Sequence, residues 1–191
     1  MKTIVALMAA TVLAAQAGAW RGSTTAGLLL TDQQGTLRIN NAGGGSVDLW
    51  REGSPALSGA YTVRATLRKL GGRRHEGYGI LFGGRYLGTD SAQYSYVLIR
   101  GDGSVLIKKR SGTATPVVRD WQVVDAVRRD DARSRAENAL EIRVTAAEVV
   151  ALVNGSEAAR VPSSALYTSG VAGLRVSHQM QVEVVGWAAG R

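Results

Sequence analysis

Cysteine is absent from this chain of 191 residues, which excludes disulfide bonds and a lipid anchor attached to a cysteine. Histidine is almost as scarce. Neither His75 nor His178 has a second histidine at the spacing of a zinc-protease motif, and no Gly-x-Ser-x-Gly pattern marks a nucleophilic serine. We therefore expect no metal, no cofactor and no catalytic residues of these kinds, and a fold held by packing and strand ladders.

A long apolar run occurs only at the N-terminus. Met1 and Lys2 give a positive start, Ile4 to Ala15 is apolar apart from one threonine, and small residues follow up to Ala19. This order is typical of a secretory signal peptide, and the run is too short for a comfortable membrane span. We predict a signal peptide over residues 1–19 and a single domain over residues 20–191, without a membrane span, in the periplasm or outside the cell.

The formal net charge of +8 raises the question of an anionic partner. The positive residues are scattered, and the densest stretch, Arg128–Arg135, mixes acids with its arginines. Because an exported protein rarely meets nucleic acid, we expect no nucleic-acid partner. The basic balance instead favours solubility and an affinity for anionic polymers. It leaves the oligomeric state open.

Beyond residue 19, hydrophobicity alternates with a period of two. Between Tyr61 and Arg68, apolar and polar residues alternate as in a half-buried β-strand. Two strand pairs are joined through Asp102-Gly103 and Asn154-Gly155, dipeptides that favour tight hairpins. Only Asp120–Glu137 departs from the pattern, and there we expect a loop with one helical turn. Further strands are predicted at Gly27–Thr31, Thr36–Asn40, Ser46–Trp50, Gly77–Gly83, Ala139–Val144, Val171–Ser177 and Gln181–Trp187.

About a dozen strands in one domain predict two packed antiparallel sheets, an all-β jelly-roll sandwich. Several stretches also match, in order, the patterns G-L-x-F, Y-x-F-x-I-x-x-D-G, N-x-L-x-V, V-N-G and G-x-x-G-L. These stretches are Gly77–Gly84, Tyr94–Gly103, Asn138–Gly155 and Gly170–Val176. On these residues the chain resembles the concanavalin A-like lectin/glucanase superfamily, and within it the bacterial exported domains related to 3-keto-disaccharide hydrolases. The resemblance covers residues 61–187.

The resemblance implies a curved sandwich whose ligands lie across a concave sheet or at its rim. It does not imply one activity, because this fold carries lectins, adhesion modules and glucanases alike. Retaining glucanases of the superfamily bear a Glu-x-Asp-x-x-Glu strand that places two carboxylates across a glycosidic bond, and this chain has no such pattern. Glu141 and Glu183 stand singly, and the alternation around Glu141 turns it away from the apolar side of its strand.

Sugar sites combine aromatic rings with planar polar groups, so the placement of the few aromatic residues is informative. The loop Gly84–Gln93 is the best candidate for a binding loop. Trp121 and Trp187 fit packing better than ligand binding. For every candidate the alternative is a structural role, in which the tyrosines pack in the core and the arginines lie on a solvated face. The candidate carbohydrate-binding residues are Tyr78, Tyr86, Tyr94, Tyr96, Arg100, Arg143 and Arg175.

Three functions stay open on the sequence. The first is a non-catalytic module that binds an oligo- or polysaccharide, neutral or anionic, or another surface. The second is a glycoside or keto-sugar hydrolase that uses the concave face. The third is a structural envelope domain without a small ligand. Two ionisable groups converging in one cleft would favour the enzyme over the other two.

Overall fold

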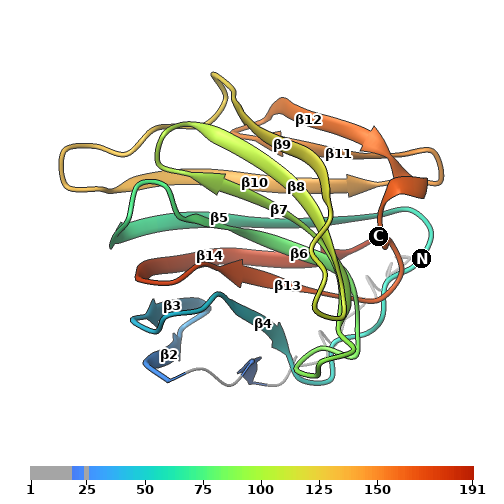
Figure 1. Ribbon diagram of the computed structural model, residues 1–191, viewed down its shortest axis with the longest axis horizontal. Coiled ribbons are helices and arrows are strands. Elements are labelled where there is room, and N and C mark those ends of the chain that lie inside the picture. The colour runs from blue at the N-terminus through green and yellow to red at the C-terminus, as the bar shows by residue number, and fades with distance from the viewer. Residues whose placement is uncertain (1–18, 24–25) are drawn as a thin grey trace, which may run out of the picture.

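Two antiparallel sheets of seven strands each pack face to face in the computed structural model (Figure 1), which describes residues 19–23 and 26–191. The first sheet has the order β1(Trp20–Gly22), β4(Val47–Arg51), β13(Val171–Val176), β6(Gly77–Arg85), β7(Gln93–Arg100), β8(Ser104–Ser111) and β9(Val117–Val123). The second has the order β12(Ser156–Pro162), β11(Glu148–Val153), β10(Ala136–Val144), β5(Tyr61–Gly72), β14(Met180–Gly190), β3(Thr36–Asn41) and β2(Leu28–Gln33).

This architecture confirms the predicted all-β sandwich. The alternation that starts at Tyr61 becomes the buried and exposed sides of β5, and both predicted hairpins form, as β7–β8 and β11–β12. Asn154 and Gly155 have φ values of 52° and 84°, the left-handed pair that a tight hairpin turn requires. The predicted signal peptide lies outside the described residues, apart from Ala19. Among the described residues, no helix is long and apolar enough to cross a bilayer.

The prediction of a helical turn within Asp120–Glu137 is wrong. β9 occupies the first part of this stretch, and residues 124–135 form turns without a helix. Some of their backbone groups bond to side chains, and others bond to the backbone of neighbouring turns. The amide group of Asn138 bonds both the N–H and the C=O of Arg128, and Asn154 Nδ2 donates to the C=O of Ala126. These side-chain bonds replace the backbone bonds that a helix would supply.

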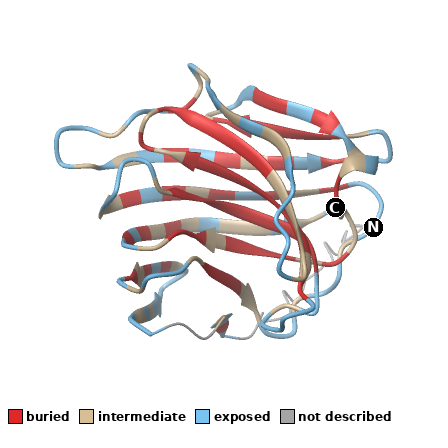
Figure 2. Ribbon diagram, in the orientation of Figure 1, coloured by how far each residue is buried: buried red, intermediate tan, exposed pale blue. Residues whose placement is uncertain are grey.

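Burial differs between the two sheets, and this difference locates the site. Along β5 and β10, buried residues alternate with exposed or half-buried ones, so the outer face of the second sheet meets solvent. Along β6 and β7, residues on both faces are buried, as the nearly unbroken red of β7 shows in Figure 2. Along β6 and β7, the outer face of the first sheet is therefore buried, although it points away from the core between the sheets.

Candidate functional site

A second apolar cluster lies on the outer face of the first sheet, separate from the main core. Leu87, from the loop between β6 and β7, and Trp121 of β9 are half-buried and pack against its edge. Most members of the cluster belong to adjacent strands and point away from the second sheet. The cluster therefore forms an apolar floor beneath the polar side chains of this face. Its buried members are Leu81, Ala92, Tyr94, Tyr96, Leu98 and Leu106.

Strand register places polar residues beside this floor. Arg175 of β13 pairs with Asp48 of β4 on one side and with Gly79 of β6 on the other. A Cβ at Gly79 would lie 2.0 Å from the carbonyl oxygen of Val97, so the position cannot take a side chain without moving the strand. The Arg175 guanidinium lies over the ring of Tyr96 with its central carbon 5.0 Å from the ring centroid.

Four side chains from four strands form one hydrogen-bonded network on this face. Tyr94 Oη donates to Asp48 Oδ2 at 2.6 Å and accepts from Arg175 Nη1 at 2.7 Å. Arg175 Nη1 also donates to Asp48 Oδ1, and Arg110 Nη1 lies 3.4 Å from Asp48 Oδ2. The single carboxylate therefore holds two arginines and one phenol in fixed positions.

Electrostatics keeps the network in one protonation state. Burial raises the pKa of Tyr94 well above its ordinary value, so the hydroxyl keeps the proton that it donates to Asp48. Burial of Arg175 is the largest influence on its pKa and lowers it, but Asp48, Tyr94 and Tyr96 together raise it more, so the net direction is upward. Tyr94 therefore stays neutral and Arg175 stays positively charged through the physiological pH range.

The two arginines still have donors to offer. Arg110 Nε donates to the C=O of Gly112, which leaves Arg110 Nη2 and the Nε and Nη2 of Arg175 without an acceptor among the described residues. None of these nitrogens is fully buried, so each of them keeps some access to solvent. Lys108 pairs with Tyr96 across β7 and β8, which puts a third positive residue on the same face.

Two half-buried tryptophans lie at the margins of this face. Trp50 is in the same cross-strand row as Tyr96, and Trp121 lies against the far end of the cluster. The guanidinium of Arg100 is 4.3 Å from the Trp121 ring centroid, and its Nε donates to Asp102 at 2.8 Å. Partial burial raises the pKa of Asp102, but bonds from Arg100 and Ser104 lower it more, so the carboxylate stays ionised.

The structure brings together four of the seven residues predicted from sequence. Tyr94, Tyr96, Arg100 and Arg175 share the outer face of the first sheet. The two tyrosines are nearly inaccessible, at 0% and 3% relative exposure, so they support the arginines and offer no open ring to a ligand.

The other three predicted residues lie elsewhere. Tyr78 faces the core between the sheets at 1% exposure, which removes it from the set because no external ligand can reach it there. Arg143 is on the outer face of the second sheet. Tyr86 is 65% exposed at the start of the β6–β7 loop, directly after β6, and its side chain forms no hydrogen bond with the network.

Asp48, Lys108 and Arg110 are the members of the site that sequence reasoning missed. Arg110 lies opposite Tyr94 in the β7–β8 ladder, so counting register outward from the Asp102-Gly103 turn would have found it. The same count would have placed Lys108 opposite Tyr96. Asp48 lies 46 residues before Tyr94 and 127 before Arg175, and only the folded sheet brings it to them.

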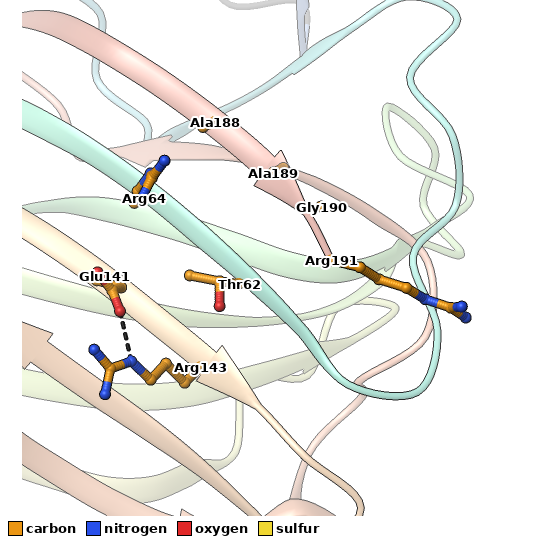
Figure 3. A pocket seen from close by; sticks show the side chains of 8 residues that line it. All are labelled: Thr62, Arg64, Glu141, Arg143, Ala188, Ala189, Gly190 and Arg191. Atoms are coloured by element: carbon orange, nitrogen blue, oxygen red, sulfur yellow. Dashed lines mark hydrogen bonds and ion pairs between the residues drawn. The ribbon is translucent and has the colours of Figure 1, made fainter.

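A shallow hollow of about 500 Å³ opens on the outer face of the second sheet (Figure 3). In it, Glu141 bonds Arg143, while the side chain of Arg191 extends away from Arg64. The cations of this hollow therefore diverge, whereas those of the first sheet converge on Asp48. The lining residues are Thr62, Arg64, Glu141, Arg143, Ala188, Ala189, Gly190 and Arg191.

Solved structures share this fold at low sequence identity. The carbohydrate-binding module CBM66 from Bacillus subtilis superposes with a TM-score of 0.71 at 10% identity, over 92% of this chain and 98% of that one. The potassium-bound carbohydrate recognition domain of Emp46p gives 0.60 at 12% identity, over 89% and 87%. The exoplasmic/lumenal domain of VIP36 in a Ca²⁺/Man2-bound form gives 0.61 at 8% identity, over 90% and 80%.

These likenesses show the fold, an all-β sandwich of two seven-stranded antiparallel sheets that matches concanavalin A-like lectin folds. No family model matches the sequence, and no curated protein matches it either. The identities are too low to transfer a function, because this architecture carries many.

Proposed function

We propose that the protein is an exported, non-catalytic module that binds carbohydrate on the outer face of its first sheet. The observation that carries this proposal is the network of Asp48, Tyr94, Arg110 and Arg175. Its arginine N–H groups without a protein acceptor keep access to solvent beside the apolar cluster of this face. The solved structures named for carbohydrate binding or recognition support it through their fold. The signal-like sequence of residues 1–19 supports export.

Sugar recognition needs rigid planar donors and an apolar surface, and this face supplies both. Guanidinium groups held by a buried carboxylate lose little conformational entropy when they bond a hydroxyl. The half-buried Trp50 and Trp121 offer ring surface at the margins, where a pyranose face could stack. Asp48 already accepts bonds from three side chains, a state suited to holding donors in place and not to proton transfer.

A polysaccharide panel tests this function against its two alternatives. The purified protein is run through gels that contain neutral or acidic polysaccharides, and each retarding polymer is then incubated with protein and assayed for reducing sugar. We expect retardation by at least one polymer without sugar release. Release of sugar would contradict the proposal in favour of a hydrolase, and an absence of retardation across the panel would favour a structural envelope role.

A matched pair of variants assigns the binding to a face. Arg110→Gln removes one positive charge from the network, and loss of a charged hydrogen bond costs about 1.5–3 kcal/mol, roughly a tenfold or greater loss of affinity. Arg64→Gln removes the same charge from an exposed position on the second sheet. We expect retardation to weaken only in Arg110→Gln. Equal loss in both variants would mean that overall charge, and not this site, governs binding.

A further inference from the structure

We infer that the ligand of this face is an acidic saccharide, whose carboxylate or sulfate group binds the free edges of Arg175 and Arg110. This inference rests on the proposed function and narrows it to a chemical class. It follows from the charge balance of the network, the directions of the free donors and the accessibility of the rings. Each of these is a property of the residues on the first sheet alone.

The network carries an excess of positive charge. Arg110 and Arg175 share the one carboxylate of Asp48, and neither forms an ion pair with any other acid among the described residues. Lys108 adds a further positive residue on the same face. The side chains of Arg110 and Arg175 are 26% and 14% exposed, so their attraction for an anion is screened less than at an open surface.

Several arginines of the second sheet are balanced by acids. On the second sheet, Arg38 and Arg68 both pair with Glu183, and Arg68 also pairs with Glu137. Arg160 on the same sheet pairs with two glutamates. Arg110 and Arg175, by contrast, share a single carboxylate.

Geometry directs both arginines toward one bound group. Both guanidinium groups bond Asp48 and both lie 5.9 Å from the centroid of the Tyr94 ring, so they share one small area of the face. Among the described residues, Arg175 uses only Nη1 for hydrogen bonds, which leaves its Nε–Nη2 edge as a two-donor fork without a protein acceptor. Such an edge matches the two oxygens of a carboxylate or the oxygens of a sulfate.

Ring accessibility favours an acidic ligand over a neutral one. A neutral sugar gains much of its affinity by stacking on open aromatic faces. The rings of Tyr94 and Tyr96 are covered, with Arg175 over both, so stacking at the centre of the site is blocked. At the centre of the face, recognition depends on the guanidinium donors, which bind an anion more strongly than a hydroxyl.

Matched acidic and neutral ligands test this inference by isothermal titration calorimetry. The probes are an oligogalacturonide, the same oligomer with its carboxyl groups methyl-esterified, and a neutral and a sulfated galacto-oligosaccharide. We expect at least tenfold tighter binding of the free acid or the sulfated sugar than of their neutral counterparts. Comparison of the two acidic arms tells whether carboxylate or sulfate is preferred.

Variants tie the preference to the arginines. Arg175→Lys keeps the charge but removes the fork, and should lower affinity for the acidic probe at least fivefold while affinity for a neutral sugar changes little. Arg110→Gln is the second test if Arg175→Lys does not fold, and Arg64→Gln is the control of unchanged affinity. Equal affinity for acidic and neutral probes would overturn the inference and leave glycan binding standing. Failure of every polymer in the panel would overturn both.

Discussion

Replacing Asp130 with asparagine is expected to lower the free energy of unfolding by about 3–5 kcal/mol. Asp130 Oδ2 accepts from Lys69 Nζ, and the two side chains are 2% and 0% exposed. Lys69 is the last of the inward-facing residues along β5, and among the described residues its only other side-chain hydrogen bond goes to the C=O of Arg73. Asparagine would leave a buried ammonium group without its counter-charge. Urea unfolding followed by circular dichroism measures the loss.

Two comparisons separate this effect from a general sensitivity to charge. Glu52→Gln breaks the exposed pair of Arg21 and Glu52, whose side chains are 60% and 58% exposed, and should cost less than about 1 kcal/mol. Lys69→Met combined with Asp130→Asn removes both charges and should recover most of the stability. A cost for Asp130→Asn as small as that for Glu52→Gln would show that the buried pair contributes little.

Asp48→Asn is expected to have the largest effect on binding, although it makes the site more positive. The carboxylate is 4% exposed and fixes Arg175, Arg110 and Tyr94 together. Without it, the arginines repel each other and lose their common position. We expect a cost of about 2–4 kcal/mol in stability. Affinity for an acidic glycan should fall about tenfold or more, since the ordered donors are lost.

The sign of the change in affinity is the informative result for Asp48→Asn. If a positive field alone attracted the ligand, removal of a negative charge would strengthen binding, and the salt dependence would steepen. If preorganised donors matter, binding weakens despite the added net charge. Calorimetry at a temperature where circular dichroism shows the variant to be folded makes the comparison. Tighter binding would contradict the role given to Asp48.

Local sequence signals predicted the strands and part of the site. Alternation with a period of two put Tyr94, Tyr96 and Arg100 on one face of one strand, and the structure keeps them there. The same reasoning failed for Tyr78, because both faces of β6 are buried and apolarity could not tell which one was interior. A strand that packs on two sides carries no alternation to read.

Long-range pairing was the part that the sequence could not supply. Arg64, Arg143 and Arg175 all occupy polar strand positions, but the first two lie on the second sheet and Arg175 on the first. Sheet membership depends on which strands cross over, and local patterns do not encode it. Asp48 was missed for the same reason. A single acid in a strand is typical of a solvent-exposed position, and only its neighbours in the folded sheet show that it is buried.

The central claim is that the outer face of the first sheet binds the glycan, and an amide chemical-shift titration by NMR tests it most directly. The ¹⁵N-labelled protein is titrated with the oligosaccharide that binds best in the panel. We predict that the largest shifts fall on β4, β7, β8 and β13 around Asp48, Tyr94, Arg110 and Arg175. Shifts centred on β5 and β10 around Arg64 and Arg143 would contradict the account and move the site to the second sheet.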